Sequence, residues 1–519
     1  MGDRTNIDAN HQNGIDMSGN GTTFDFVSGG KMAYGAGVLI VPLVSKPQPP
    51  MEVVQRVDAV CNDAVSELLS AHAVADEVGH LGHTTRSGSY RRVLVVSLGE
   101  ASGLDGLRVR NAAAAAARWL IAEKIPQASL WLDGLLISGL ESATLEWIHG
   151  MALAGFTFTQ RKSSDPRSPA NIRIHLCSSE SSHVARAMPA VREAVALADA
   201  VNYARRIAHE PPNIINPDTL ADEARALAKT NKLKCMILAE PQLRRLKMNG
   251  ILSVGCSATP GPCLIQLDYN AAPKSSARTI LVGKAVTFDT GGYSIKPADG
   301  MEAMKFDKCG GVTVLGIMKA VSDLKMKCNV TGVIAAAENA ISDRAYRPAD
   351  IITMASGKTV EIISTDAEGR MLLGDALWYA QEKLAGRTVI DLATLTGGAK
   401  ICLGTAAACM MSNDDNLCAD LEESGRVTQE RLWRLPLWDD FRELIKSPDA
   451  DIKNSAGKRD AHTIVGGMFL KEFVKPETAW AHLDIASVAN RDDTRMPTGK
   501  GATGFGIRLL IDFLRRRSR

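Results

Sequence analysis

The sequence predicts an α/β protein with two domains, each built on a mostly parallel sheet flanked by helices. Short apolar runs that are typical of buried strands, such as Gly37–Pro42 and Thr279–Val282, alternate with longer segments of helical periodicity. The 519 residues exceed the usual size of a single domain, roughly 150 residues. A hydrophobic share of 45% and a charged share of 23% are typical of globular proteins.

The N-terminal half is expected to contain a disordered tail followed by the smaller domain. Residues 1–35 are rich in Asn, Gly, Asp and Ser and offer few apolar side chains for a core. Residues 36–188 form the expected N-terminal α/β domain. Its predicted strands are Gly37–Pro42, Arg92–Leu98 and Ala128–Leu132, and its predicted helices are Val54–Ala71 and Leu107–Glu123.

A long helical pattern from Pro189 to His209 marks the expected domain boundary. Two prolines end this pattern, because proline removes a backbone donor and restricts the residue before it. We therefore assign residues 189–213 to a linker helix and residues 214–519 to the larger C-terminal domain. The strands predicted there are Met236–Leu238, Thr279–Val282, Val330–Ala336 and Val389–Leu392, and the helices are Val312–Leu324 and Met371–Lys383.

Charge and composition argue against several classes of function. The formal net charge of +2 provides no general attraction to nucleic acid or to membranes. The arginines from Arg515 to Arg519 are interpreted as a helix end, where cations suit the helix dipole. No apolar run reaches the ~18 residues of a membrane span, and no secretory signal is recognised. None of the ten cysteines forms a CxxC pair, so we expect a reducing, cytoplasmic location.

The first group of candidate site residues surrounds the strand at Thr279–Val282. Lys284 follows this strand, and a lysine in an apolar environment needs a partner or must lose its charge. Asp289 lies five positions further on, so a straight strand would aim the two side chains at opposite faces. The glycine pair after Asp289 is expected to bend the chain and let them converge. Lys296 and Asp307 follow, although Asp307 alone would also suit a helix cap.

The second group lies in the segment Ser364–Arg370. Asp366, Glu368 and Arg370 alternate, so in an extended segment they would point to one side. The helical run that begins at Met371 places a helix N-terminus where it can hold an anion near Arg370.

Together the two groups predict a dinuclear metal site, provided that they converge. Two divalent cations would balance the −4 charge of four carboxylates, Asp289, Asp307, Asp366 and Glu368. Oxygen ligands suit Mg or Mn, and zinc also accepts them. Lys284 can be a ligand only as a neutral amine, a form that burial and two dications would favour.

Two stretches carry a resemblance to a known family. Residues 282–311, VGKAVTFDTGGYSIKPADGMEAMKFDKCGG, resemble the metal-binding region of leucyl aminopeptidases, also called cytosol aminopeptidases. Residues 364–377, STDAEGRMLLGDAL, resemble the signature that this family usually writes as NTDAEGRL. The similarity covers roughly residues 195–500, and the chain is identified as a member of a divergent branch of probable aminopeptidases.

The resemblance implies a set of metal ligands. Asp289 and Glu368 correspond to the ligands that bridge both metals. Lys284 and Asp307 correspond to the remaining ligands of the tighter, more buried site. Asp366 corresponds to a ligand of the more exchangeable site, through its carboxylate and its carbonyl.

The resemblance also implies a catalytic pair and a reaction. Arg370 would hold a bicarbonate that takes a proton from the metal-bound water, and Lys296 would stabilise the oxyanion. A hydroxide that bridges two divalent metals, Zn or Mn with Mg or Co as alternatives, would then release the N-terminal residue of a peptide. A pocket near Met304 and Thr394–Gly398 would favour Leu or Met. The family further implies a macro-domain-like N-terminal unit and a homohexamer.

The chain departs from the family pattern at a few positions. Ser364 replaces the usual Asn, Ala349 and Ser487 replace glycines, and Ala461–Leu470 differs from the usual alanine-rich helix start. None of these changes removes a ligand, so we expect them to affect side-chain preference and rate.

Two other functions remain open at this point. One is a non-catalytic assembly that binds nucleic acid or protein partners, although intact ligands and a near-neutral charge argue against it as the main role. The other is a phosphatase, whose sites often use DxH or HxD pairs. Asp460 with His462, and His482 with Asp484, fit that pattern but are interpreted as structural. His209 is also interpreted as structural, because the following prolines forbid the helix of an HExxH site.

Overall fold

The computed structural model describes residues 21–30, 37–46, 49–85, 89–138, 141–163, 171–493 and 496–518. The described chain divides into two compact units, both α/β as the sequence predicts. The N-terminal unit reaches Asn202 and includes a short return at residues 492–500, and the C-terminal unit contains Tyr203–Arg491 and Gly501–Arg519. The division falls within one helix, α6 (Ser181–His209).

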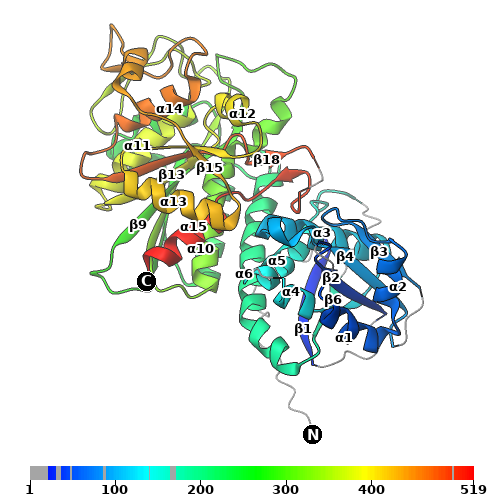
Figure 1. The fold of residues 1–519 in the computed structure, drawn as a ribbon. Coiled ribbons are helices and arrows are strands. Elements are labelled where there is room, and N and C mark those ends of the chain that lie inside the picture. Colours follow the sequence, from blue (N-terminus) through cyan, green and yellow to red (C-terminus); the bar gives the residue numbers. More distant parts are fainter. Residues whose placement is uncertain are drawn as a thin grey trace. The chain divides into compact units, whose positions relative to one another are not determined.

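The N-terminal unit is built on a six-stranded sheet in the order β1-β6-β5-β2-β4-β3 (Figure 1). All neighbouring strands pair in parallel except β3, which runs antiparallel to β4. The strands are β1 (Thr23–Gly30), β2 (Val38–Leu43), β3 (Leu81–Thr84), β4 (Arg92–Ser97), β5 (Gln127–Trp131) and β6 (Asn171–Cys177).

Helices cover both faces of this sheet, because side chains alternate along the buried strands. Val38 and Ile40 of β2 pack into one apolar cluster with α3 (Gly106–Ala122) and α5 (Ala143–Gly155). Leu39 and Val41 pack into a second cluster with α1 (Met51–Cys61) and α2 (Ala64–Ser70). The strand therefore reads as a continuous apolar run in the sequence.

The single helix expected at Val54–Ala71 is wrong, since the segment forms α1 and α2. Asn62 and Asp63 separate the two helices with φ angles of 51° and 56°. Asn and Asp tolerate this left-handed conformation better than most residues, so the pair makes a compact break.

The expected disorder of residues 1–35 is wrong for Thr23–Gly30, which forms the edge strand β1. Phe24 and Phe26 alternate with polar residues, are each 8% exposed, and pack their rings 6.4 Å apart. Parallel pairing with β6 and burial of these rings offset the ordering of a Gly- and Ser-containing segment. Residues 1–20 and 31–35 of the expected tail lie outside the described residues.

The helix expected to start at Pro189 begins eight residues earlier, at Ser181, and contains Pro189 inside it. A proline in a helix interior removes a hydrogen bond and costs roughly 3 kcal/mol. Val184, Ala187, Val191 and Ala194 recur at helical spacing and are all buried, so one apolar face extends across the proline. This packing explains why the helix continues through a residue that usually marks an end.

The C-terminal unit is built on an eight-stranded sheet in the order β15-β14-β17-β13-β9-β10-β8-β7. Its centre, β17-β13-β9-β10, is parallel, and β7, β8 and β14 introduce the antiparallel pairs. The strands are β7 (Lys234–Leu238), β8 (Cys263–Asn270), β9 (Arg278–Asp289), β10 (Asn329–Asn339), β13 (Thr388–Ala393), β14 (Ala408–Ser412), β15 (Leu432–Arg434) and β17 (Ala479–Asp484).

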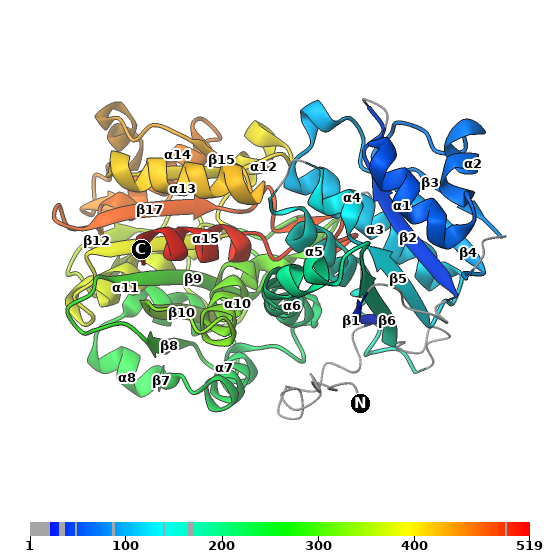
Figure 2. The same cartoon turned by 60° about the horizontal axis from the view of Figure 1, so that its bottom comes forward.

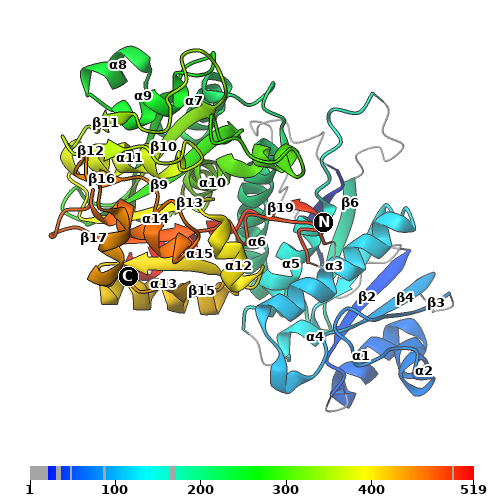
Figure 3. The ribbon, with the colours of Figure 1, turned by 90° about the horizontal axis from the view of Figure 1, so that it is seen from above.

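Helices flank both faces of this sheet too. Figures 2 and 3 show α10 on one side of β9 and β10 and α11 on the other. The first layer includes α7 (Pro217–Asn231), α10 (Cys309–Asp323), α13 (Asp415–Thr428) and α15 (Ile507–Arg517), and the second includes α9 (Asn249–Gly255), α11 (Gly369–Glu382) and α14 (His462–Lys471). Among the described residues, no helix has the length and apolar character needed to cross a membrane.

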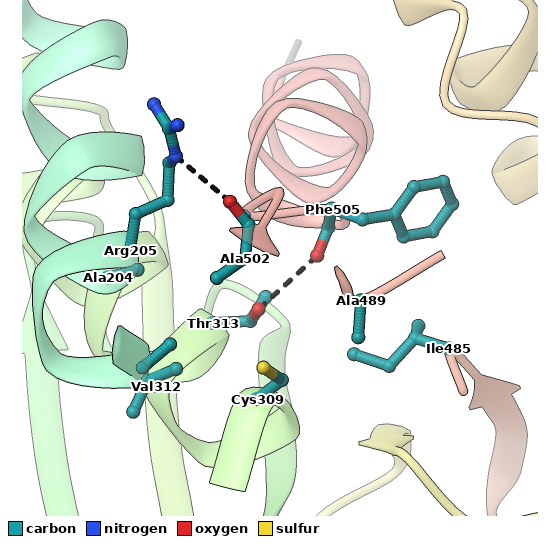
Figure 4. A pocket seen from close by; sticks show the side chains of 11 residues that line it. Ala204, Arg205, Cys309, Val312, Thr313, Ile485, Ala489, Ala502 and Phe505 are labelled. Atoms are coloured by element: carbon teal, nitrogen blue, oxygen red, sulfur yellow. Dashed lines mark hydrogen bonds between the residues drawn. The ribbon is translucent and has the colours of Figure 1, made fainter. Parts of the chain in front are cut away.

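A small pocket lies in the C-terminal unit beside the end of α6 (Figure 4). Arg205 donates to the carbonyl of Ala502 at 3.0 Å, and Thr313 donates to that of Phe505 at 3.2 Å. The remaining lining is small or apolar and contains no carboxylate. This pocket therefore offers little for binding a charged ligand, and the chemistry-bearing residues lie elsewhere.

Replacing Phe26 with Ala tests the edge strand. We expect the free energy of unfolding to fall by about 3 kcal/mol, because a buried aromatic ring is lost from the core of the N-terminal unit. Chemical denaturation would measure the change, with the exposed Ser28→Ala on the same strand as a near-neutral control. Equal stability of both variants and the wild type would contradict the assignment of β1.

The free energy of unfolding should depend on pH through the buried side chain of His209. Burial lowers the pKa of His209 from 6.5 to about 4. Its contribution is therefore complete above pH 6.5 and is lost as the pH falls towards 4, by up to about 3 kcal/mol. Urea unfolding at neutral and acid pH should show a smaller pH dependence for His209→Gln than for the wild type. The exposed His72→Gln should behave as the wild type does.

Candidate metal centre

Four parallel strands end at one edge of the large sheet, and each delivers a polar side chain there. Asp289 closes β9, Asn339 closes β10, Asp484 closes β17, and Thr394 follows β13 directly. In open α/β sheets, ligands bind outside the carboxyl ends of the strands. The candidate site therefore lies where the fold class places it.

A β-bulge in β9 brings Lys284 and Asp289 to the same side. Val286 pairs with Ala337 and Asp289 with Asn339, so β9 advances three residues while β10 advances two. The extra residue shifts the alternation of side chains by one position. The expected bend at the glycine pair is thus not the cause of convergence, because β9 is continuous through Asp289.

Lys284 lies at the centre of the buried half of the site and is 2% exposed. Its ammonium group lies 2.8 Å from a carboxylate oxygen of Asp307 and 2.8 Å from one of Glu368. It also donates to the carbonyl oxygen of Thr394 at 2.9 Å. Gly369 makes room for it, since an added Cβ there would meet Lys284 Nζ at 2.7 Å.

Lys296 lies in the more open half of the site. Its ammonium group is 2.7 Å from Asp289 Oδ2 and forms a second ion pair with Asp366. The side chain of Asp366 is 38% exposed, against 8% for Asp307 in the buried half. Asn339 Nδ2 donates to the other oxygen of Asp289 at 2.8 Å and fixes that carboxylate.

The carboxylates of Asp289, Asp366 and Glu368 converge so that one oxygen of each lies within 4.8 Å of the others. Asp307 joins them through Lys284. Four carboxylates thus surround two lysines, and the arrangement keeps an excess of negative charge. Burial raises the pKa of Asp307 to about 7, and it also raises the pKa of Glu368. A divalent cation would compensate this excess negative charge on the carboxylate oxygens, so the residues fit a metal centre.

The segment that carries Asp366, Glu368 and Arg370 is not extended, so the expected alternation is wrong. Asp366 lies in a turn, and Glu368 is already helical, with φ −75° and ψ −37°, at the start of α11. Arg370 lies near the carboxylates without forming an ion pair with them among the described residues, and it donates to the carbonyl of Asn454 at 2.7 Å. Its Nε is buried without a hydrogen-bond partner in the described structure, and burial lowers the pKa of Arg370 to about 10.

Three further residues hold the site, and of these only Thr394 was named from the sequence, as the start of the expected substrate pocket. Asn339 fixes Asp289 as described above. Asn454 accepts from the amide of Ile363 at 2.8 Å and donates to the carbonyl of Ser364 at 2.7 Å, which secures the loop before α11. Thr394 donates to Asp307 Oδ1 at 2.7 Å. Only Asn339 and Thr394 had a usable signal, since both lie where predicted parallel strands end.

The departures from the family pattern are accommodated locally. Ala349 has a φ of 73°, in the left-handed region where glycine is usual. Ser487 is buried, and its hydroxyl donates to the carbonyl of Ala407 at 2.7 Å. Ser364 accepts from the amide of Asp366 at 3.2 Å. Neither new hydroxyl is left without a hydrogen bond.

The histidines of the two pairs contact residues outside the carboxylate cluster. His482 is fully buried and bonds to Asp391 at 2.5 Å, as a structural histidine would. His462 opens α14 and packs on Gly398, where an added Cβ would lie 3.3 Å from its Nδ1. Gly466, one turn along the same helix, lies against Arg370. One face of α14 therefore borders the Arg370 side of the site.

Comparisons of the chain with known proteins identify the family that it resembles. The description "Cytosol aminopeptidase family, catalytic domain" matches residues 202–511, and "Cytosol aminopeptidase family, N-terminal domain" matches residues 40–165. The chain is 38% identical over 457 residues to a probable cytosol aminopeptidase of Cenarchaeum symbiosum, covering 87% of this chain and 92% of that one. It is 40% identical over 425 residues to one of Geotalea uraniireducens, covering 82% and 85%.

A solved structure agrees with the sequence relatives. The bottromycin maturation enzyme BotP in complex with Mn superposes with a TM-score of 0.82 at 29% identity, covering 93% of this chain and all of that one. Matches to both domain descriptions, relatives similar along most of their length, and a carboxylate-lysine cluster at the sheet edge lead to one conclusion. The chain belongs to the cytosol aminopeptidase family of metal-dependent exopeptidases.

Proposed function

We propose that the chain removes apolar N-terminal residues, Leu or Met above all, from peptides with two divalent metals. In this proposal Asp289 and Glu368 bridge the metals, Lys284 and Asp307 complete the buried site, and Asp366 completes the open one. The observation that carries it is the convergence of Asp289, Asp366 and Glu368 beside Lys284.

The difference in burial supports two unequal metal sites. Lys284 and Asp307 are shielded from solvent, whereas Asp366 is partly open to it. A metal in the buried half would have to displace protons from Lys284 and Asp307, whose carboxyl pKa burial raises to about 7. In the open half, the side chain of Asp366 is partly exposed to solvent, so a metal bound there would exchange faster.

The chain's own residues suit the remaining steps of peptide hydrolysis. When bound, the metals would activate a water and polarise the scissile carbonyl. Lys296 reaches into the open half, where its ammonium group can stabilise the negative charge that develops on the carbonyl oxygen. Arg370 offers a buried guanidinium beside the carboxylates, and we propose that it holds a bicarbonate that accepts the water's proton.

The proposed preference for Leu or Met rests on the loop after β13. Leu395 of this loop packs on α14, where an added Cβ on Gly466 would lie 3.0 Å from its Cδ2. Met304 is partly buried in the 3₁₀ helix Met301–Lys308, which also carries Asp307. Apolar side chains on these two segments favour an apolar residue at the substrate's N-terminus.

The identity of the metals and the assembly are further parts of the proposal. BotP was solved with Mn, and carboxylate ligands with one amine suit Mn or Zn, with Mg or Co as alternatives. A homohexamer and a cytoplasmic location rest on the family resemblance alone. We propose no nucleic-acid or membrane partner, since the net charge is only +2.

Metal binding should be visible as stabilisation of the folded chain. Adding Mn²⁺ to metal-free protein at about 100 times the dissociation constant of a site should raise the free energy of unfolding by about 2.7 kcal/mol for that site. Glu368→Gln should lose most of this gain, because it removes a carboxylate from the cluster. Exposed Glu382→Gln, on the outer end of α11, should keep it. Thermal unfolding with and without Mn²⁺ would measure both.

Activity should require both the metals and Lys296. Hydrolysis of leucine amide should stop with a chelator and return with Mn²⁺ or Zn²⁺. Lys296→Met should lower kcat about 100-fold or more, because it removes a donor to the developing oxyanion. Lys319→Met on α10, whose ammonium pairs only with Asp323 among described residues, should remain active. Fully metal-loaded wild type that hydrolyses no member of a broad aminoacyl panel would refute the proposed function.

A further inference from the structure

Asp484 is a fully buried carboxylate at the carboxyl end of β17, next to the candidate metal centre. Within the described chain its hydrogen-bond donors are three backbone amides and one hydroxyl. Oδ1 accepts from Leu395 N at 3.1 Å, from Thr396 N at 3.4 Å and from Ala486 N at 3.2 Å. Oδ2 accepts from Thr396 Oγ1 at 2.6 Å. A buried carboxylate is costly unless it is hydrogen-bonded, so these donors hold the Asp484 side chain in one position.

The donors of Asp484 belong mainly to the loop that follows β13. Thr396 uses its one hydroxyl proton on Asp484, so Thr463 of α14 must donate to Thr396 Oγ1 at 2.9 Å. Thr396 Oγ1 also accepts from the amide of Ala399, which caps α12 (Gly397–Leu403). One carboxylate therefore ties together β17, the loop after β13, and the starts of α12 and α14.

The first residue of that loop acts directly on the buried half of the site. Thr394 donates its hydroxyl to Asp307 Oδ1 at 2.7 Å and offers its carbonyl oxygen to Lys284 Nζ at 2.9 Å. Leu395 and Thr396, which Asp484 holds, follow immediately. With their amides fixed, the orientation of the Thr394 peptide is fixed as well. Asp484 is thus two steps away from Asp307 and Lys284 through a continuous set of hydrogen bonds.

We propose that Asp484 is a positioning residue for the buried metal site, holding the Thr394–Thr396 loop so that Thr394 orients Asp307 and Lys284. The inference rests on the proposed function and adds a residue to it. Residues that orient metal ligands in this way typically change metal affinity 10- to 100-fold when removed. Asp484 would not touch substrate or metal, and its effect would pass through Thr394.

The chain offers a matched control in Asp375 of α11. Its carboxylate is also fully buried and also accepts from backbone amides, those of Ile251 at 3.1 Å and Ala355 at 2.9 Å. Those amides belong to α9 and to the loop before the second strand of a small sheet, β11 (Ile351–Thr353) with β12 (Thr359–Glu361). Loss of Asp375 should destabilise the same unit without reaching the loop after β13.

The test is a titration of the metal-free full chain with Co²⁺, followed by calorimetry and by the visible absorption of the bound cobalt. We expect the wild type to bind two Co²⁺ per chain. Asp484→Ala should weaken one of the two by about 10- to 100-fold and change its absorption bands. In Asp484→Asn the amide oxygen can still accept from the backbone amides, and the amide nitrogen can donate to Thr396 Oγ1. The affinity of this variant for Co²⁺ should therefore be near the wild-type value. Asp375→Ala should keep wild-type affinities and spectrum.

The possible results separate the inference from a general loss of stability. Asp484→Ala with wild-type affinities and spectrum overturns the inference, and so does an equal weakening in Asp375→Ala. If Asp484→Ala does not fold, Thr396→Val removes the hydroxyl that Asp484 holds, together with its bonds to Thr463 and Ala399, and leaves the backbone amides on Asp484. An unchanged cobalt spectrum in that variant overturns the inference instead. A wild-type chain that binds no Co²⁺ refutes the proposed function itself, and the positioning role with it.

Discussion

The structure depends on an excess of negative charge held at the edge where four parallel strands end. Four carboxylates share two lysines there, and the buried pair, Asp307 and Glu368, has raised carboxyl pKa values because burial disfavours their charge. Such a cluster would repel itself without cations close by. The surrounding backbone allows the carboxylates and lysines to come together. A bulge in β9 turns Asp289 towards the cluster, and the missing side chain of Gly369 leaves space for Lys284. Under the proposed function, folding and metal binding would therefore be coupled at this edge of the sheet.

Much of this arrangement could be predicted from the sequence, because it depends on local patterns. The strands carrying Lys284 and Asp289 read as a buried apolar run, and the fold class placed their ends at a ligand site. What could not be predicted depends on pairing between segments. The bulge exists only relative to β10, and the turn at Asp366 is held by the distant Asn454. Pro189 likewise marks a helix end until the buried face around it is known.

The same reasoning explains which supporting residues a sequence reveals. Asn339 could be anticipated, since it closes β10, which contains the strand predicted at Val330–Ala336. Asn454 could not, because it lies in an irregular segment. Its side chain donates to the carbonyl of Ser364, and its own backbone carbonyl accepts from Arg370. Asp484 was noticed only as part of an HxD pair. Its role becomes visible once β17 is seen to run parallel to β13, which brings it to the loop at Thr394.

One departure from the family pattern, at the start of α14, falls where this dependence is weakest. Lys284, Asp289 and Glu368 lie on or against the central strands, where a shift of one residue would reverse every side chain. By contrast, the face of α14 that carries His462 and Gly466 borders the site through Gly398, Leu395, Thr396 and Arg370. Under the proposed function, changes there would alter the space beside the metal site without altering its proposed ligands. We therefore expect them to affect the residue that is cleaved, while the chemistry, which needs the strands in register, stays the same.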